Sequence, residues 1–273
     1  MRVRGRRWSG AALAAALVAA GCGGEGSEAA PRVERLPDLL QKAPYGLSGE
    51  TVRVAGRPRF RLGFASAVDN VGQGPLVIVG RRGARGEGVM GATQIVRRSD
   101  GSSHRYPGVG VLHYTIATTH QHWHLLRFDR YELRSMAEGT LVRPDRKTGF
   151  CLGDRYQTDP ATTLPGEPLA AIWTDECGKS QPLLRSVREG ISPGYGDDYD
   201  PLLEGQYVDI TRLPAGRYEL VHRVNADRRL RESKYGNNAA SVILELSWPR
   251  GLTHEPAIDV VARCGDGRRC HGR

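Results

Sequence analysis

Lysine is scarce in this chain of 273 residues: of its 39 basic residues other than histidine, only Lys42, Lys147, Lys179 and Lys234 are lysines. No internal repeat is visible. No basic run is interleaved with aromatic residues, which argues against a nucleic-acid-binding protein. The apolar stretch from Ala11 to Ala20 is too short to span a bilayer as a mature helix.

The overall composition is that of an ordinary globular protein. The chain is 39% hydrophobic and 25% charged, with a net charge of +9, so it can bury a substantial core. It has 35 glycines and 16 prolines, which indicate many turns.

Residues 1–21 are predicted to be an export signal, with four arginines before the apolar stretch. The Arg6-Arg7 pair permits a twin-arginine route as well as the general one. Small residues before Cys22 resemble a bacterial lipobox, which predicts a lipidated Cys22 and attachment to the outer face of the cytoplasmic membrane. Cleavage without lipidation, giving a secreted soluble protein, is the alternative. Removal of four arginines lowers the net charge from +9 to +5.

The cysteine count agrees with export. With Cys22 lipidated, Cys151, Cys177, Cys264 and Cys270 remain, and an even number in an exported chain predicts two disulfides. Proximity in the sequence favours Cys151–Cys177 and Cys264–Cys270, while the other two pairings stay open.

The sequence predicts four parts: a signal peptide (1–21), a lipidated tether and N-terminal arm (22–50), a main β domain (51–250), and a C-terminal tail with a disulfide loop (251–273). Val33 to Leu40 is interpreted as a short helix or an extended arm. Glu255 to Arg263 is interpreted as a short terminal helix.

The main domain shows strand patterns separated by turn residues. Strands are predicted at Arg59–Phe64, Pro75–Val79, Ala92–Val96, His120–Leu133, Thr140–Val142, Thr148–Leu152, Gln206–Ile210, Arg217–Val224 and Ala240–Trp248. Residues 153–205 are predicted to be a long irregular loop, of the kind that is usually functional or partly structured. Together these patterns predict an all-β fold, a β-sandwich of short antiparallel strands with long irregular loops.

Three histidines alternate at His120, His122 and His124, within one predicted strand. Alternate side chains of a strand point to the same face, so all three imidazoles share one side. Imidazole is a ligand for Cu, Zn, Fe and Ni, and a metal explains the burial of so much imidazole better than a histidine-rich core strand. The outer Cα atoms are about 13 Å apart on a straight strand, so a twist, a bulge or inclined rings must bring them together.

Two later segments extend this pattern. The histidine strand is followed by Lys147 to Leu152 (K-x-x-F-C-L), then by Gly190 to Gly194 (G-I-S-P-G) and by Tyr199. Gln206 to Thr211 and Glu232 to Asn238 come later in the chain. In the order and spacing of these motifs the sequence resembles the lysyl oxidase family, from about Phe60 to Trp248.

The resemblance implies a copper-dependent amine oxidase with Cu(II) on His120, His122 and His124. It also implies that Lys147 and Tyr199 form lysine tyrosylquinone. Tyr195 is a nearby rival for the tyrosine, but it stands at a family cysteine position. The enzyme would oxidise primary amines such as peptidyl-lysine to aldehydes with dioxygen, releasing hydrogen peroxide and ammonia.

The catalytic base is predicted to be Asp197, which matches a family aspartate; Asp198 and Asp200 are rivals. With Glu204 these carboxylates would concentrate an ammonium substrate around the quinone.

The chain also departs from the vertebrate pattern, because Thr119, Tyr195 and Gly205 stand where family cysteines are found. A thinner disulfide framework leaves the substrate range open. A non-catalytic exported copper-binding protein and a cell-surface β-sandwich interaction module are the alternative functions.

Overall fold

The computed structural model describes residues 1, 31–117, 121–144, 149–159, 162–201, 203 and 205–270. The predicted signal peptide, Cys22, His120 and Lys147 lie outside these residues. The chain divides into two units, Met1–Pro31 and Arg32–Arg273, and every described strand belongs to the second.

The described residues form strands and no helix, and all their pairings are antiparallel, which confirms the all-β fold class. None of them therefore forms a helix long and apolar enough to cross a membrane.

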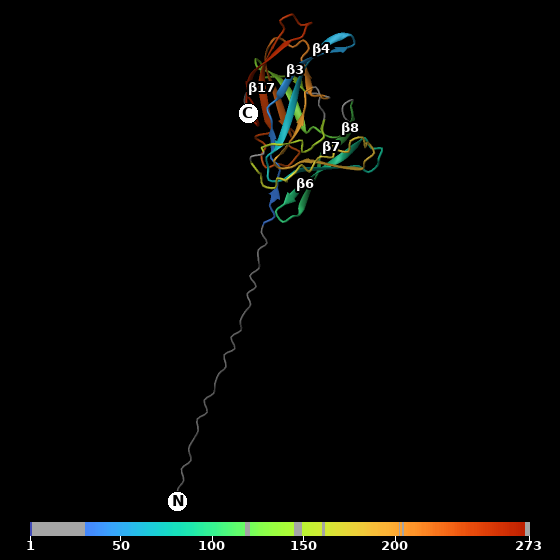
Figure 1. Cartoon of the computed structure of the whole chain (residues 1–273), viewed down its shortest axis with the longest axis vertical. Coiled ribbons are helices and arrows are strands. Elements are labelled where there is room, and N and C mark those ends of the chain that lie inside the picture. The colour runs from blue at the N-terminus through green and yellow to red at the C-terminus, as the bar shows by residue number, and fades with distance from the viewer. Residues whose placement is uncertain are drawn as a thin grey trace. The chain divides into compact units, whose positions relative to one another are not determined.

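The strands make three sheets. Figure 1 labels β3, β4, β6, β7, β8 and β17 among these strands. The first has the order β11 (Gly149–Phe150), β8 (Gln121–Leu126), β7 (Ser103–Ile116), β6 (Val89–Arg98), β5 (Leu76–Arg81) and β13 (Ser186–Ile191), with β1 (Glu34–Arg35) also beside β6. The second has the order β10 (Leu141–Pro144), β9 (Asp129–Ser135), β16 (Gly216–Val224), β17 (Ala239–Ser247) and β18 (Ala257–Arg263). The third has the order β12 (Tyr156–Gln157), β14 (Tyr195–Tyr199), β4 (Arg57–Asn70) and β15 (Tyr207–Asp209), with β2 (Leu39–Gln41) and β3 (Tyr45–Val54) also beside β4.

The three sheets meet at a buried aromatic cluster. Phe64 of the third sheet lies 4.7 Å from Tyr131 and 4.8 Å from His222 of the second, measured between ring centroids. Phe150 of the first sheet lies 6.3 Å from Tyr131 and 4.7 Å from Tyr199. Burial of these rings, with edge-to-face geometry, stabilises the junction from which the site is built.

The predicted strand His120–Leu133 is two strands, and that prediction is wrong beyond Leu126. Arg127 has a φ of 61°, in the left-handed region that ends regular strand geometry. The chain therefore leaves the first sheet after β8 and enters the second sheet as β9.

Other expectations also change. Residues 153–205 contain β12, β13 and β14, so the long loop is only partly irregular. The helix predicted at Glu255–Arg263 is instead β18, because Ala257–Ser247 pairing continues the edge of the second sheet. Val33–Leu40 is an extended arm, the second of its two interpretations.

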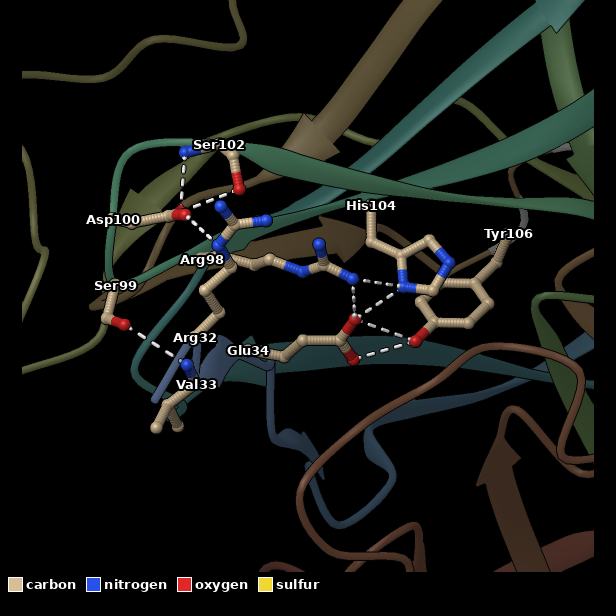
Figure 2. A network of polar contacts seen from close by, with 9 residues as sticks. All are labelled: Arg32, Val33, Glu34, Arg98, Ser99, Asp100, Ser102, His104 and Tyr106. Atoms are coloured by element: carbon tan, nitrogen blue, oxygen red, sulfur yellow. Dashed lines mark hydrogen bonds and ion pairs between the residues drawn. The ribbon is translucent and has the colours of Figure 1, made fainter. Parts of the chain in front are cut away.

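The arm is fixed to the first sheet by a polar network around Glu34 (Figure 2). The Tyr106 hydroxyl donates to both Glu34 oxygens at 2.7 and 2.8 Å, and His104 Nδ1 lies 2.7 Å from Oε1. Burial tends to raise the pKa of Glu34, but these hydrogen bonds outweigh burial and the net pKa is lowered. The charged carboxylate therefore favours docking of β1 on β6.

Both predicted disulfides are confirmed. Cys151 and Cys177 are joined, with Cα atoms 5.7 Å apart, and Cys264 and Cys270 are joined, with Cα atoms 5.2 Å apart. Disulfides fit an exported protein.

Glu232 is a buried carboxyl that connects the arm to the loop between β16 and β17. It accepts hydrogen bonds from the Leu39 amide at 3.0 Å and from the side chains of Asn225 and Asn238 at 2.6 Å. Burial is the main reason that the pKa of Glu232 is raised to about 7 from 4.5.

A raised carboxyl pKa means that the folded state binds the proton more tightly than the unfolded state. The contribution to stability is complete below about pH 4.5 and is lost as the pH rises to about 7. We expect the free energy of unfolding to fall over this range, by up to about 3 kcal/mol from this group. Glu232→Gln should flatten the fall in urea titrations, whereas Glu255→Gln, an exposed control, should not. Identical pH profiles for both variants would contradict this role.

Candidate functional site

Strand β8 places His122 and His124 on one side, as their alternation predicts. Their ring centroids are 4.7 Å apart, with planes at 55°, so the two imidazoles already converge. His124 is buried, and its Nδ1 lies 3.0 Å from the Thr115 hydroxyl on the neighbouring strand β7. A contact of this kind orients a metal-ligating imidazole, so Thr115 is a supporting residue that the sequence analysis missed.

The donor set fits copper as far as the structure describes it. His122 and His124 are adjacent imidazoles, and imidazole is a copper ligand. His120 falls outside the described residues, so its place in the set stays a prediction. Within the described ranges, no group of three His, Cys, Asp or Glu residues could hold a metal ion. The described part of the chain thus supplies two of the three predicted ligands.

Tyr199 is held by the backbone of Cys151. Its hydroxyl accepts a hydrogen bond from the Cys151 amide at 2.7 Å and donates to the Cys151 carbonyl at 3.0 Å. Its ring packs edge-on against Phe150 at 4.7 Å. Burial raises the pKa of the Tyr199 phenol well above its usual value, and the nearby Asp197 adds to the shift. The phenol is therefore neutral.

The segment that holds Tyr199 is paired with the histidine strand. In β11, Gly149 is the partner of Leu126, and Phe150 is the partner of Leu125. A Cβ on Gly149 would lie 2.8 Å from the Cβ of His124, so glycine is what lets the strands approach so closely here. Strand β11, strand β8 and Tyr199 are thus brought together across 78 positions of sequence, counted from His122 to Tyr199 inclusive.

The Cys151–Cys177 disulfide reinforces this junction. The Trp123 amide, between the two histidines, donates to the Cys177 carbonyl at 3.1 Å. Cys151, whose backbone holds the Tyr199 hydroxyl, is therefore also covalently linked to a segment that is hydrogen-bonded to β8.

Asp197 and Tyr199 lie on the same face of β14, two residues apart, and Asp197 is only 3% exposed. The Asp197 carboxylate lies 3.5 Å from Arg155 Nε. Asp198 points to the opposite face, where burial and the exposed Asp200 raise its pKa. The predicted acidic group is therefore divided between two faces, and Asp197 is the member beside the tyrosine.

Two buried carboxyls here escaped the sequence analysis. Glu189 of β13 is fully buried, and burial, with Asp197 second, raises its pKa well above the usual value. Asp154 accepts hydrogen bonds from the Ser192 amide at 2.7 Å and the Ser192 hydroxyl at 2.9 Å, which fixes the G-I-S-P-G turn. Neither carboxyl residue belongs to a recognisable sequence motif, so its position next to a motif was the only signal in the sequence that could have indicated it.

Fold and site together define an all-β, disulfide-bonded protein in which a pair of strand imidazoles adjoins a segment holding a buried tyrosine. Residues 171–250 match the family model described as Lysyl oxidase. This match includes the G-I-S-P-G turn, Tyr199 and Gln206 to Thr211, and it begins after the histidine strand. Over these residues the chain is similar to the lysyl oxidase family, which agrees with the resemblance of its motifs.

Curated relatives agree with this assignment. The chain is 31% identical over 120 residues to lysyl oxidase homolog 1 of Homo sapiens, covering 44% of this chain and 18% of that protein. It is 29% identical over 125 residues to protein-lysine 6-oxidase of Sus scrofa, covering 44% of this chain and 41% of that protein. It is also 29% identical over 125 residues to protein-lysine 6-oxidase of Gallus gallus, covering 44% of this chain and 24% of that protein. The chain thus spans less than half the length of these relatives.

Proposed function

We propose that this protein is an exported, copper-dependent amine oxidase that converts primary amines such as peptidyl-lysine to aldehydes, with release of hydrogen peroxide and ammonia. The observation that carries the proposal is the pair of hydrogen bonds between the Tyr199 hydroxyl and Cys151. They fix the tyrosine at the segment that follows Lys147 and pairs with the histidine strand.

The proposed reaction requires two groups that the translated polypeptide does not contain. His122 and His124, with His120, would hold copper, and Lys147 and Tyr199 would form lysine tyrosylquinone. When present, copper supplies redox chemistry with dioxygen, and the quinone supplies an electrophilic carbonyl and an electron sink.

The reach of the chain supports the pairing of Lys147 with Tyr199. Lys147 precedes Cys151 by four residues, and an extended chain spans at most about 3.6 Å per residue, or about 14 Å here. Because the Tyr199 hydroxyl contacts the Cys151 backbone, a lysine four residues before Cys151 is within reach of the ring.

Asp197 is the residue best placed to take a proton from bound substrate. It shares the face of Tyr199, and its carboxylate lies 3.5 Å from Arg155 Nε. Burial excludes water around this carboxylate, so its charge acts more strongly than an exposed one. Export and a membrane anchor at Cys22 remain part of the proposal.

Peptide mapping of copper-treated, aerated protein tests the proposal. After reduction, we expect the peptides carrying Lys147 and Tyr199 to be covalently joined. Lys147→Arg should lose the link and the amine oxidase activity but keep copper, because guanidinium stays protonated and is a poor nucleophile. Lys179→Arg, which changes an exposed lysine paired with Glu176, is the matched control.

Separate, unmodified peptides in a preparation that still oxidises amines would refute the cofactor assignment. Bound copper without any activity, and with the same separate peptides, would instead favour a non-catalytic copper-binding protein.

A further inference from the structure

A basic cavity of about 1120 Å³ opens between the β16–β17 loop and the C-terminal disulfide loop, which runs from Cys264 to Cys270. Four arginines, Arg223, Arg228, Arg268 and Arg269, line it together with Tyr235. Arg223 follows His222, whose ring packs on Phe64, so the arginine lies on the face of the second sheet that points away from the third. None of the residues around Tyr199 lines this cavity.

The arginine charges are only partly balanced. Arg269 forms an ion pair with Glu219 at 2.5 Å. In the described part of the chain, Arg223, Arg228 and Arg268 form no ion pair, and Asp227 nearby is already shared by three other arginines. The cavity therefore has an excess of positive charge.

The C-terminal disulfide loop, which carries Arg268 and Arg269, has a fixed backbone. Besides the Cys264–Cys270 disulfide, the Cys270 amide donates to the Ser241 hydroxyl at 2.7 Å. The Ser241 amide donates to the Arg268 carbonyl at 3.2 Å. Two of the four arginines are thus presented from a preorganised wall, which lowers the entropy cost of binding.

We propose that this cavity binds a ligand with two or more clustered phosphate groups. The planar guanidinium of arginine matches phosphate oxygens in bidentate fashion. Around one cavity, three guanidinium groups that form no ion pair with any described residue suit a polyanion better than a single anion. The phosphates could belong to a free oligophosphate or to the headgroups of an anionic bilayer. The proposal does not depend on the amine oxidase function.

Titration calorimetry with inorganic tripolyphosphate, on the full chain, tests the site. We expect binding that weakens as salt rises, because salt screens the charges. Arg223→Gln with Arg268→Gln should weaken it by at least about tenfold. Arg59→Gln with Arg250→Gln removes the same charge from exposed positions outside the cavity and should leave binding unchanged.

Sedimentation with phosphatidylglycerol vesicles distinguishes the two sources of phosphate. Vesicle binding that is lost in the cavity variant and kept in the control assigns the headgroup, while tripolyphosphate binding alone assigns a free ligand. Absence of binding to both probes, or an equal loss in the control, overturns the proposal. Thermal melts check folding, and if the double variant unfolds, Arg268→Gln alone takes its place because this side chain is exposed.

Discussion

Replacing His122 with alanine should remove most of the bound copper and abolish amine oxidation. His122 is the central histidine of the predicted set, and its ring converges on that of His124 in the structure. Without it, His120 and His124 stand four residues apart, about 13 Å between Cα atoms on a straight strand, which is too far for easy chelation. Elemental analysis of the purified variant, beside an assay for hydrogen peroxide, measures both losses.

A matched control is His254→Ala, which removes an exposed histidine after β17. Its copper content and activity should equal those of the unchanged protein. Undiminished copper in His122→Ala would show that the metal, if any, binds elsewhere, and the copper assignment would fail. A thermal melt of the copper-free proteins separates this result from unfolding.

Replacing Asp197 with asparagine should lower kcat for primary amines by about 10²–10⁴-fold, the usual contribution of a general base. Asparagine has nearly the same volume but cannot accept the proton. The carboxylate lies beside Tyr199 on β14 and near Arg155, so loss of its charge also removes an ion pair that is partly buried. Steady-state kinetics over a range of pH separate a loss of the base from weaker substrate binding, which would change KM instead.

Asp198→Asn is the control, since it makes the same chemical change one residue along the strand. Asp198 points to the opposite face of β14, so its replacement should change kcat little. Full kcat in Asp197→Asn, or equal losses in both variants, would require another base. Glu189 would then be tested next, because it is buried close enough to Asp197 for that carboxylate to raise its pKa.

Much of the site was predictable because its parts are local patterns. Alternation put His122 and His124 on one face, as the structure shows. The order of the K-x-x-F-C-L segment, the G-I-S-P-G turn and Tyr199 indicated the resemblance to lysyl oxidases, with which the comparisons agree. The pairing of Cys151 with Cys177 followed from proximity and was confirmed. Each of these inferences uses residues close together or a motif complete in itself.

The sequence by itself determined the all-β class, the common face of His122 and His124 and the resemblance to the lysyl oxidase family. Two-residue alternation and fixed motifs are properties of short stretches of chain. Only the tertiary structure decided that the long strand breaks at Arg127, and that β13 and β14 form within the supposed loop. It also separated Asp197 from Asp198 and placed Tyr199 on the Cys151 backbone. These features depend on pairing between residues far apart in the sequence, since a strand forms where a partner offers its hydrogen bonds. The arginine cavity has the same origin: its side chains come from β16, the following loop and the C-terminal disulfide loop, and no local pattern joins them.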